Sequence, residues 1–120
     1  MTNRSDAAEV AANYVRTITA DVERNDYADA AADYVDVHAL DADYVVDSRG
    51  HVKGLHLIVG TGGPHVEVQH RIGAEVVQVR VWWWGDYADE SVHAPHLAAE
   101  LDGLGDAWQD ANLHGAGVTR

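Results

Sequence analysis

The sequence predicts a single α+β domain: N-terminal helices, a four- or five-stranded antiparallel meander sheet, and a C-terminal helix packed on one face. Short β-branched segments separated by glycine-containing turns fill residues 42–92, which is typical of a meander. Apolar residues at helical spacing before and after this region predict the helices. The length of 120 residues suits one domain with one core. Residues 1–5 and 115–120 are expected to be loosely held at its ends.

The first helix is predicted over residues 6–24, with Ser5 as its N-cap. Asp6 and Glu9 lie near the positive end of the helix dipole, where negative charge is favourable. One side of this helix is expected to face a core, because apolar residues recur along it at helical spacing: Ala11, Val15, Ile18 and Val22.

A second, alanine-rich helix is predicted over residues 26–37, with one longer, kinked helix as the alternative because no glycine or proline separates the two. Aspartates at i, i+3, i+7 and i+10 would then share one face of this helix: Asp26, Asp29, Asp33 and Asp36. Two interpretations stay open. The carboxylates can form a solvated outer face, or they can present a row of negative charge to a basic partner. The absence of Lys and Arg from residues 26–47 fits the second interpretation.

Strands are predicted over residues 42–47, 52–60, 65–71 and 75–84, with a short fifth strand at 87–92. The glycine-rich loop at 60–65 lacks the Gly-Lys-Ser/Thr ending of a phosphate-binding loop and precedes a strand, so it predicts a tight hairpin. The last helix is expected to begin at Pro95, since proline is favoured in the first turn. Gly103 and Gly105 are expected to weaken it, and its apolar stripe is Leu97, Leu101, Leu104 and Trp108.

Alternation along the strands divides the sheet into two faces once the turns set the pairing. The turns place Tyr44 opposite Leu55 and Leu57 opposite Val68, and a turn centred on Ile72 and Gly73 places Val68 opposite Val77. The predicted inner face holds Tyr44, Leu55, Leu57, Val59, Val66, Val68, Val77, Val79, Val81 and Trp83. The predicted outer face holds Asp43, Val45, His56, Ile58, His65, Glu67, Gln69, Gln78, Arg80, Trp82 and Trp84.

The outer face has the composition of a protein interface, because two tryptophans lie beside an arginine there. Trp82, Trp84 and Arg80 are therefore candidates for contact with a partner or with a second copy of the chain. The alternative is that the second helix or the C-terminal tail covers the two tryptophans. For Arg80, a cross-strand ion pair beside His65 and Glu67 is a sufficient structural role.

A metal site is the second candidate on this face. His56, His65 and Glu67 lie together in the predicted register, and imidazole with carboxylate suits zinc or a similar divalent ion. The same residues also permit acid–base chemistry. No nucleophile accompanies them, and the chain has no cysteine, so the sequence favours a protein that is not an enzyme.

Charge limits the partners. The net charge of −12 argues against direct binding to DNA, RNA or anionic lipid, which relies on Lys and Arg. The acidic surface is either an adaptation to a salty or GC-rich host, as in halophilic proteins, or an imitation of a polyanion that attracts basic proteins. No apolar run is long enough to span a bilayer, and the polar start is unlike a signal peptide, so a soluble cytoplasmic protein is expected.

Two segments resemble small uncharacterised proteins of phages and other mobile elements. The first is the turn and strand from Gly62 and Gly63 through Pro64, His65, Val66 and Glu67, and the second is Trp83, Trp84, Gly85, Asp86 and Tyr87. The resemblance covers roughly residues 43–113. It implies an α+β fold and a mobile-element setting, and it supplies no catalytic residues.

These observations lead to the hypothesis of an acidic, non-enzymatic interaction protein of the anti-CRISPR or anti-restriction type, which engages a basic host protein that handles nucleic acid. A homodimer formed through the tryptophans is compatible with it. The competing hypotheses are a small metal- or ligand-binding protein and an acid-rich halophilic domain without a specific partner. The expected partner-binding residues are Asp26, Asp29, Asp33, Asp36, Arg80, Trp82, Trp84, Asp102, Asp106 and Asp110.

Overall fold

The computed structural model describes residues 6–115, and it confirms the predicted α+β fold with five strands. The expected Ser5 cap and the expected loose ends lie outside these residues, except that Gly115 is the last residue of a helix. The elements in chain order are α1 (Asp6–Ile18), a π-helical turn η1 (Thr19–Glu23), α2 (Ala30–His38), β1 (Asp41–Val46), β2 (Val52–Gly60), β3 (His65–Arg71), β4 (Val76–Trp83), β5 (Asp86–His93) and α3 (Pro95–Gly115).

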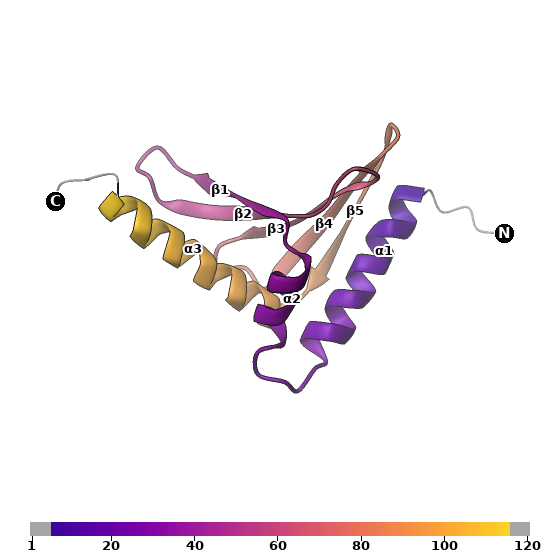
Figure 1. The fold of residues 1–120 in the computed structure, drawn as a ribbon, viewed down its shortest axis with the longest axis horizontal. Helices are drawn as coiled ribbons and strands as arrows, with labels where there is room; N and C mark the ends of the chain where they lie inside the picture. The colour runs from indigo at the N-terminus through magenta and orange to yellow at the C-terminus, as the bar shows by residue number, and fades with distance from the viewer. Residues whose placement is uncertain (1–5, 116–120) are drawn as a thin grey trace.

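The five strands form one antiparallel sheet in the order β1-β2-β3-β4-β5, so each strand pairs with its neighbours in sequence. The sheet is strongly bent, and α1, α2 and α3 all lie on the same side of it (Figure 1). No described segment lies over the other side, which we call the uncovered face.

The pairing of the first three strands is confirmed, with Tyr44 opposite Leu55 and Leu57 opposite Val68. The predicted pairing of β3 with β4 is wrong by two residues, because Val68 lies opposite Val79 and not Val77. Ile72 donates its backbone N–H to the Lys53 carbonyl at 3.0 Å, so Ile72 continues the pairing with β2 and the turn falls later in the chain. Since the shift is an even number of residues, every side chain in these two strands keeps its predicted face.

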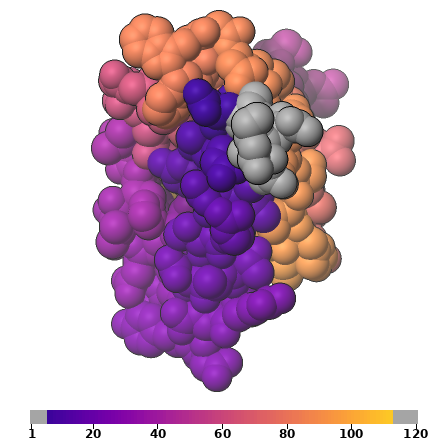
Figure 2. Space-filling view, turned by 90° about the vertical axis from the view of Figure 1, so that its right-hand side faces the viewer, coloured from indigo at the N-terminus to yellow at the C-terminus, as the bar shows by residue number. Residues whose placement is uncertain are grey.

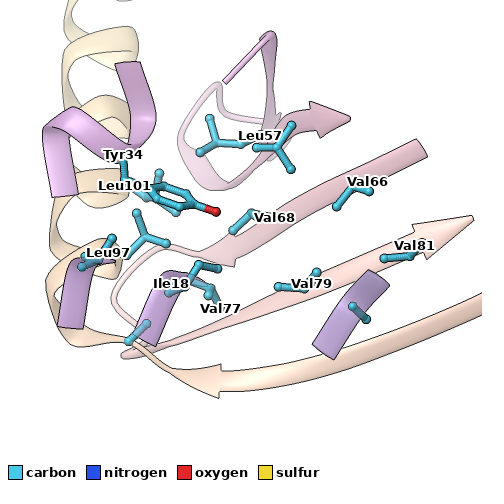
Figure 3. Packing of buried hydrophobic residues seen from close by; sticks show 14 of the residues in the cluster. Ile18, Tyr34, Leu57, Val66, Val68, Val77, Val79, Val81, Leu97 and Leu101 are labelled. Atoms are coloured by element: carbon cyan, nitrogen blue, oxygen red, sulfur yellow. The ribbon is translucent and has the colours of Figure 1, made fainter. Parts of the chain in front are cut away.

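The core lies between the inner face of the sheet and the three helices, and its valines come from neighbouring strands (Figure 3). Ile18, Leu97 and Leu101 are fully buried against them. Tyr34 on α2 also points into this layer, and its buried hydroxyl has no hydrogen-bond partner among the described residues. Burial, with smaller contributions from Tyr14 and Asp21, raises the pKa of Tyr34 well above its ordinary value.

The predicted second helix begins later than expected, at Ala30. The side chain of Asn25 accepts a hydrogen bond from the Tyr27 backbone N–H at 2.9 Å, a local bond that competes with helix formation. Asp26 therefore lies in the loop and Asp29 immediately before the helix, so the four aspartates do not share one helix face.

The last helix begins at Pro95 as predicted and runs without a break through both glycines. Gly105 has a packing role, because a Cβ at this position would lie 2.9 Å from Cδ1 of Ile72. Near the end of α3, Trp108 stacks on Tyr44 of β1 with ring centroids 5.2 Å apart. The glycines therefore cause no break in α3, and Gly105 allows the close approach of α3 to the turn after β3.

Carboxylates tie the helix starts to the rest of the fold. The two carboxylate oxygens of Glu23 accept the backbone N–H groups of His96 and Leu97, at 3.0 and 2.9 Å, and so cap α3. Asp86, at the start of β5, accepts the N–H of Ala7 in α1 at 3.2 Å. Both acids therefore have structural roles that their positions in the sequence do not reveal.

Candidate functional site

The uncovered face is arranged in rows that cross the strands, because residues paired across neighbouring strands point to the same side. One row joins His65, Trp82 and Tyr87. The next joins Ile58, Glu67, Arg80 and Asp89, and a third joins Asp43, His56, Gln69, Gln78 and Ser91. In this order along the strands, we call them the aromatic row, the charged row and the amide row.

The aromatic row forms a continuous series of rings across β3, β4 and β5. The ring centroids of His65 and Trp82 are 5.5 Å apart, and those of Trp82 and Tyr87 are 5.3 Å apart. Trp82 is 38% exposed and Tyr87 is 44% exposed. The alternative that the chain covers Trp82 with its own second helix is wrong, because α2 lies on the other side of the sheet.

Glu67 is the centre of a polar network in the charged row. One of its carboxylate oxygens lies 2.7 Å from Nε2 of His65, and the other accepts the Gln69 amide at 2.8 Å and lies 3.5 Å from Nδ1 of His56. Burial by itself would raise the pKa of Glu67. The hydrogen bonds from His65 and Gln69 and the nearby imidazoles outweigh burial, and the pKa is lowered overall.

His56, His65 and Glu67 are adjacent, as the sequence predicts, but their arrangement differs from a metal site. The Glu67 carboxylate lies between the two imidazoles and contacts each through a different oxygen, so the three groups do not face a common point. Within residues 6–115, no three His, Cys, Asp or Glu side chains gather in a way that could hold a metal ion.

Arg80 lies opposite Glu67 and not opposite His65 as predicted. Its guanidinium donates to Oε1 of Gln78 at 3.2 Å and forms no ion pair with any described residue. Nε of Arg80 is buried without a partner in this part of the chain. The predicted cross-strand ion pair is therefore absent, and the cation is directed along its own strand towards the amide row.

Trp84 lies at the tip of the β4–β5 hairpin. It was expected to continue the alternation of β4, but the last strand pair is Trp83 with Asp86, so Trp84 and Gly85 form the two-residue loop. Both have positive φ, 50° for Trp84 and 82° for Gly85, as in a type I′ turn. Trp84 is the one residue other than glycine with positive φ among residues 6–115, and it is 88% exposed.

The predicted acidic residues lie on the helical side of the molecule, in two groups. Asp26 and Asp29 precede α2 and Asp33 and Asp36 lie within it, and all four are exposed. On α3, Asp106 and Asp110 are exposed, whereas Asp102 accepts hydrogen bonds from His70 and from the Gly73 backbone. Asp102 thus has a structural role. A substitution of Asp102 would therefore change both the fold and the predicted row of binding carboxylates.

The exposed hairpin and the acidic side belong to different parts of the surface. In Figure 2, α1 faces the viewer, the chain that follows it forms the lower end, and the hairpin end of the sheet rises above it.

No helix within the described residues is long and apolar enough to cross a membrane. Comparison with protein-family models, with curated proteins and with solved structures finds no match to this chain.

Proposed function

We propose that this protein is a non-enzymatic binding protein whose β4–β5 hairpin and aromatic row contact a partner protein. The observation that carries the proposal is the conformation of Trp84. A positive φ costs a residue with a Cβ about 1–2 kcal/mol, and asparagine or glycine would remove most of that cost. A bulky apolar side chain that is almost fully exposed in such a turn does not stabilise the fold. Tryptophan is also the residue type most enriched among binding hot spots.

The charge of the helical side indicates a basic partner. Residues 6–39 and α3 together hold twelve acidic residues and two arginines. Such a field speeds the association with a cationic surface and does not by itself fix the geometry of the complex. Proteins that handle nucleic acid carry cationic surfaces of this kind. We therefore propose that the protein acts as an inhibitor of the anti-CRISPR or anti-restriction type, and the mobile-element setting that the sequence resemblance implies fits this proposal.

The test is a cleavage assay with purified CRISPR nucleases and restriction endonucleases, each titrated with the protein. We expect stoichiometric inhibition of at least one nuclease. The rate constant for association of the protein with that nuclease should fall about tenfold between low and high salt. Trp84→Asn should abolish the inhibition, while Tyr27→Asn, which changes an exposed aromatic on the helical side, should preserve it. Inhibition that is equal in both variants and independent of salt would contradict the proposal.

A homodimer is the competing use of the same tryptophans. Light scattering of the purified protein distinguishes the two, because a dimer that Trp84→Asn converts to a monomer assigns the hairpin to self-association. A monomer of unchanged mass in both proteins leaves the hairpin available for a different partner.

A further inference from the structure

A hollow of about 670 Å³ lies on the uncovered face, at the end away from Trp82. Its walls come from the ends of β2, β3 and β4 and from four members of the amide row: His56, Gln69, Gln78 and Ser91. A volume of this size is within the range of small-molecule sites. The strand register separates it from the aromatic row by the intervening row of Glu67 and Arg80.

The floor of the hollow is bare backbone. Gly54 of β2 lies opposite Arg71 of β3, and a Cβ on Gly54 would come within 2.7 Å of the His70 carbonyl oxygen. No larger residue fits there without moving β2 away from β3. Apolar side chains adjoin this floor, among them Val45 and Val76, which are 44% and 41% exposed. The site therefore offers apolar contact as well as polar groups.

The charge of the hollow is opposite to that of the protein. The chain carries a net charge of −12, yet among the described residues no aspartate or glutamate lines the hollow, whereas Lys53 and Arg71 do. Lys53 has a long ion pair to Asp47, at 3.7 Å, and its side chain is 62% exposed. The Arg71 side chain forms no hydrogen bond or ion pair with any residue of the described chain, although acids are abundant in this protein. A cation left unpaired in such a protein is available to a ligand.

We propose that this hollow binds a small organic anion, with its carboxylate or phosphate group held by Arg71 and its apolar body against Val45 and Val76. Lys53, the Gln78 amide and the Ser91 hydroxyl supply further donors. The site is independent of the proposed contact through the hairpin, because it uses other residues and takes a ligand of the opposite charge to a basic partner.

The test is a titration of the isotope-labelled full chain, followed by the backbone amide signals in NMR spectra. Benzoate and hexanoate probe carboxylates, phenyl phosphate probes phosphates with an apolar body, inorganic phosphate probes the anion alone, and benzamide is the neutral control. We expect saturable shifts of Gly54, Gln69 and Gln78 with benzoate or phenyl phosphate and none with benzamide. The tighter of these two anions identifies the group that the site prefers.

Arg71→Gln should weaken that binding about tenfold or more, because one charge-assisted contact is lost. The matched control is Arg24→Gln, which removes the same charge from an exposed arginine on the helical side. Lys53→Gln is a second variant, with a smaller expected loss, should Arg71→Gln disturb the spectrum of the free protein. Equal binding to Arg71→Gln and Arg24→Gln, equal shifts with benzoate and benzamide, or no saturable shift with any probe would each overturn the proposal.

Discussion

The imidazole of His70 and the carboxylate of Asp102 are 2.8 Å apart, and they join the end of β3 to the middle of α3. The His70 side chain is fully buried, and its other ring nitrogen lies 3.3 Å from the Val76 carbonyl. Asp102 also accepts the backbone N–H of Gly73, at 3.0 Å, in the turn that the sequence places wrongly. One carboxylate therefore holds a buried histidine and the β3–β4 turn against the helix.

Asp102→Ala should lower the free energy of unfolding by about 1–3 kcal/mol, because a buried imidazole and a backbone donor lose their acceptor. Asp106→Ala is the control, since Asp106 is exposed one turn later on the same helix and should change stability by less than about 0.5 kcal/mol. Urea denaturation of the three proteins measures the difference. Equal stability of the two variants would show that the His70–Asp102 contact makes no net contribution to the free energy of unfolding.

Trp84→Asn should raise the free energy of unfolding by about 1 kcal/mol, because Asn followed by Gly is the favoured pair for a type I′ turn. The midpoint of thermal unfolding should then rise by roughly 4 °C. The same substitution is expected to remove partner binding, so it separates stability from function at one position. A variant that is less stable than the native protein would show that Trp84 contributes to folding.

Glu67→Gln should make the free energy of unfolding fall less steeply as the pH is lowered. The folded state lowers the pKa of Glu67 below its ordinary value of 4.5, so the carboxylate stabilises the fold above this pH. That contribution is lost as the pH falls through the lowered pKa. Unfolding midpoints in urea, measured from neutral pH down to about pH 3, should therefore decline less steeply for Glu67→Gln than for the native protein. Parallel declines would contradict the assigned role of the Glu67 network.

Gly103→Ala and Gly105→Ala form a matched pair on α3. A Cβ at 103 meets no atom within 4 Å, so alanine there should stabilise the protein by about 0.5–1 kcal/mol through helix propensity. A Cβ at 105 would lie 2.9 Å from Cδ1 of Ile72 and 3.4 Å from Cγ1 of Val52. The gain in propensity is then offset by the displaced Ile72 methyl, and Gly105→Ala should be the less stable variant. Chemical denaturation ranks the two.

Tyr34→Phe should leave stability unchanged or raise it by about 1 kcal/mol, because the buried hydroxyl that it removes has no partner in the described chain. Tyr14→Phe is the control. The Tyr14 hydroxyl donates to the Val59 carbonyl at 3.4 Å, so its removal should lower stability slightly. A loss of stability in Tyr34→Phe larger than that in Tyr14→Phe would mean that the Tyr34 hydroxyl has a partner after all.

Much of the fold follows from the sequence because alternation in the strands is strong. Val66, Val68, Val79 and Val81 reach the core although the predicted β3–β4 pairing is off by two, since only an odd shift would reverse their faces. The turn itself could not be placed, because the backbone bond from Ile72 to Lys53 depends on a strand far from the turn in the sequence.

The candidate site is less accessible to sequence reasoning. Exposure of Trp82 follows from alternation, but the turn conformation of Trp84 follows from the last strand pair, which no motif marks. Spacing in the sequence cannot show that Asn25 delays the second helix, or that Asp102 is used by His70. The hollow does not follow from the sequence alone, because Lys53 and Arg71 come to line it only when β2 pairs with β3. Two features of the sequence indicate it: a glycine inside a strand, Gly54, and the presence of cations in an acidic chain that has few of them.

Glu23 bonds to backbone groups that lie 73 and 74 residues later in the chain. During synthesis on the ribosome, the Glu23 carboxylate therefore cannot cap α3 until that helix has been made. A chain interrupted before Pro95 would lack Leu97 and Leu101, and the part of the core that they complete would be open to chaperones and proteases.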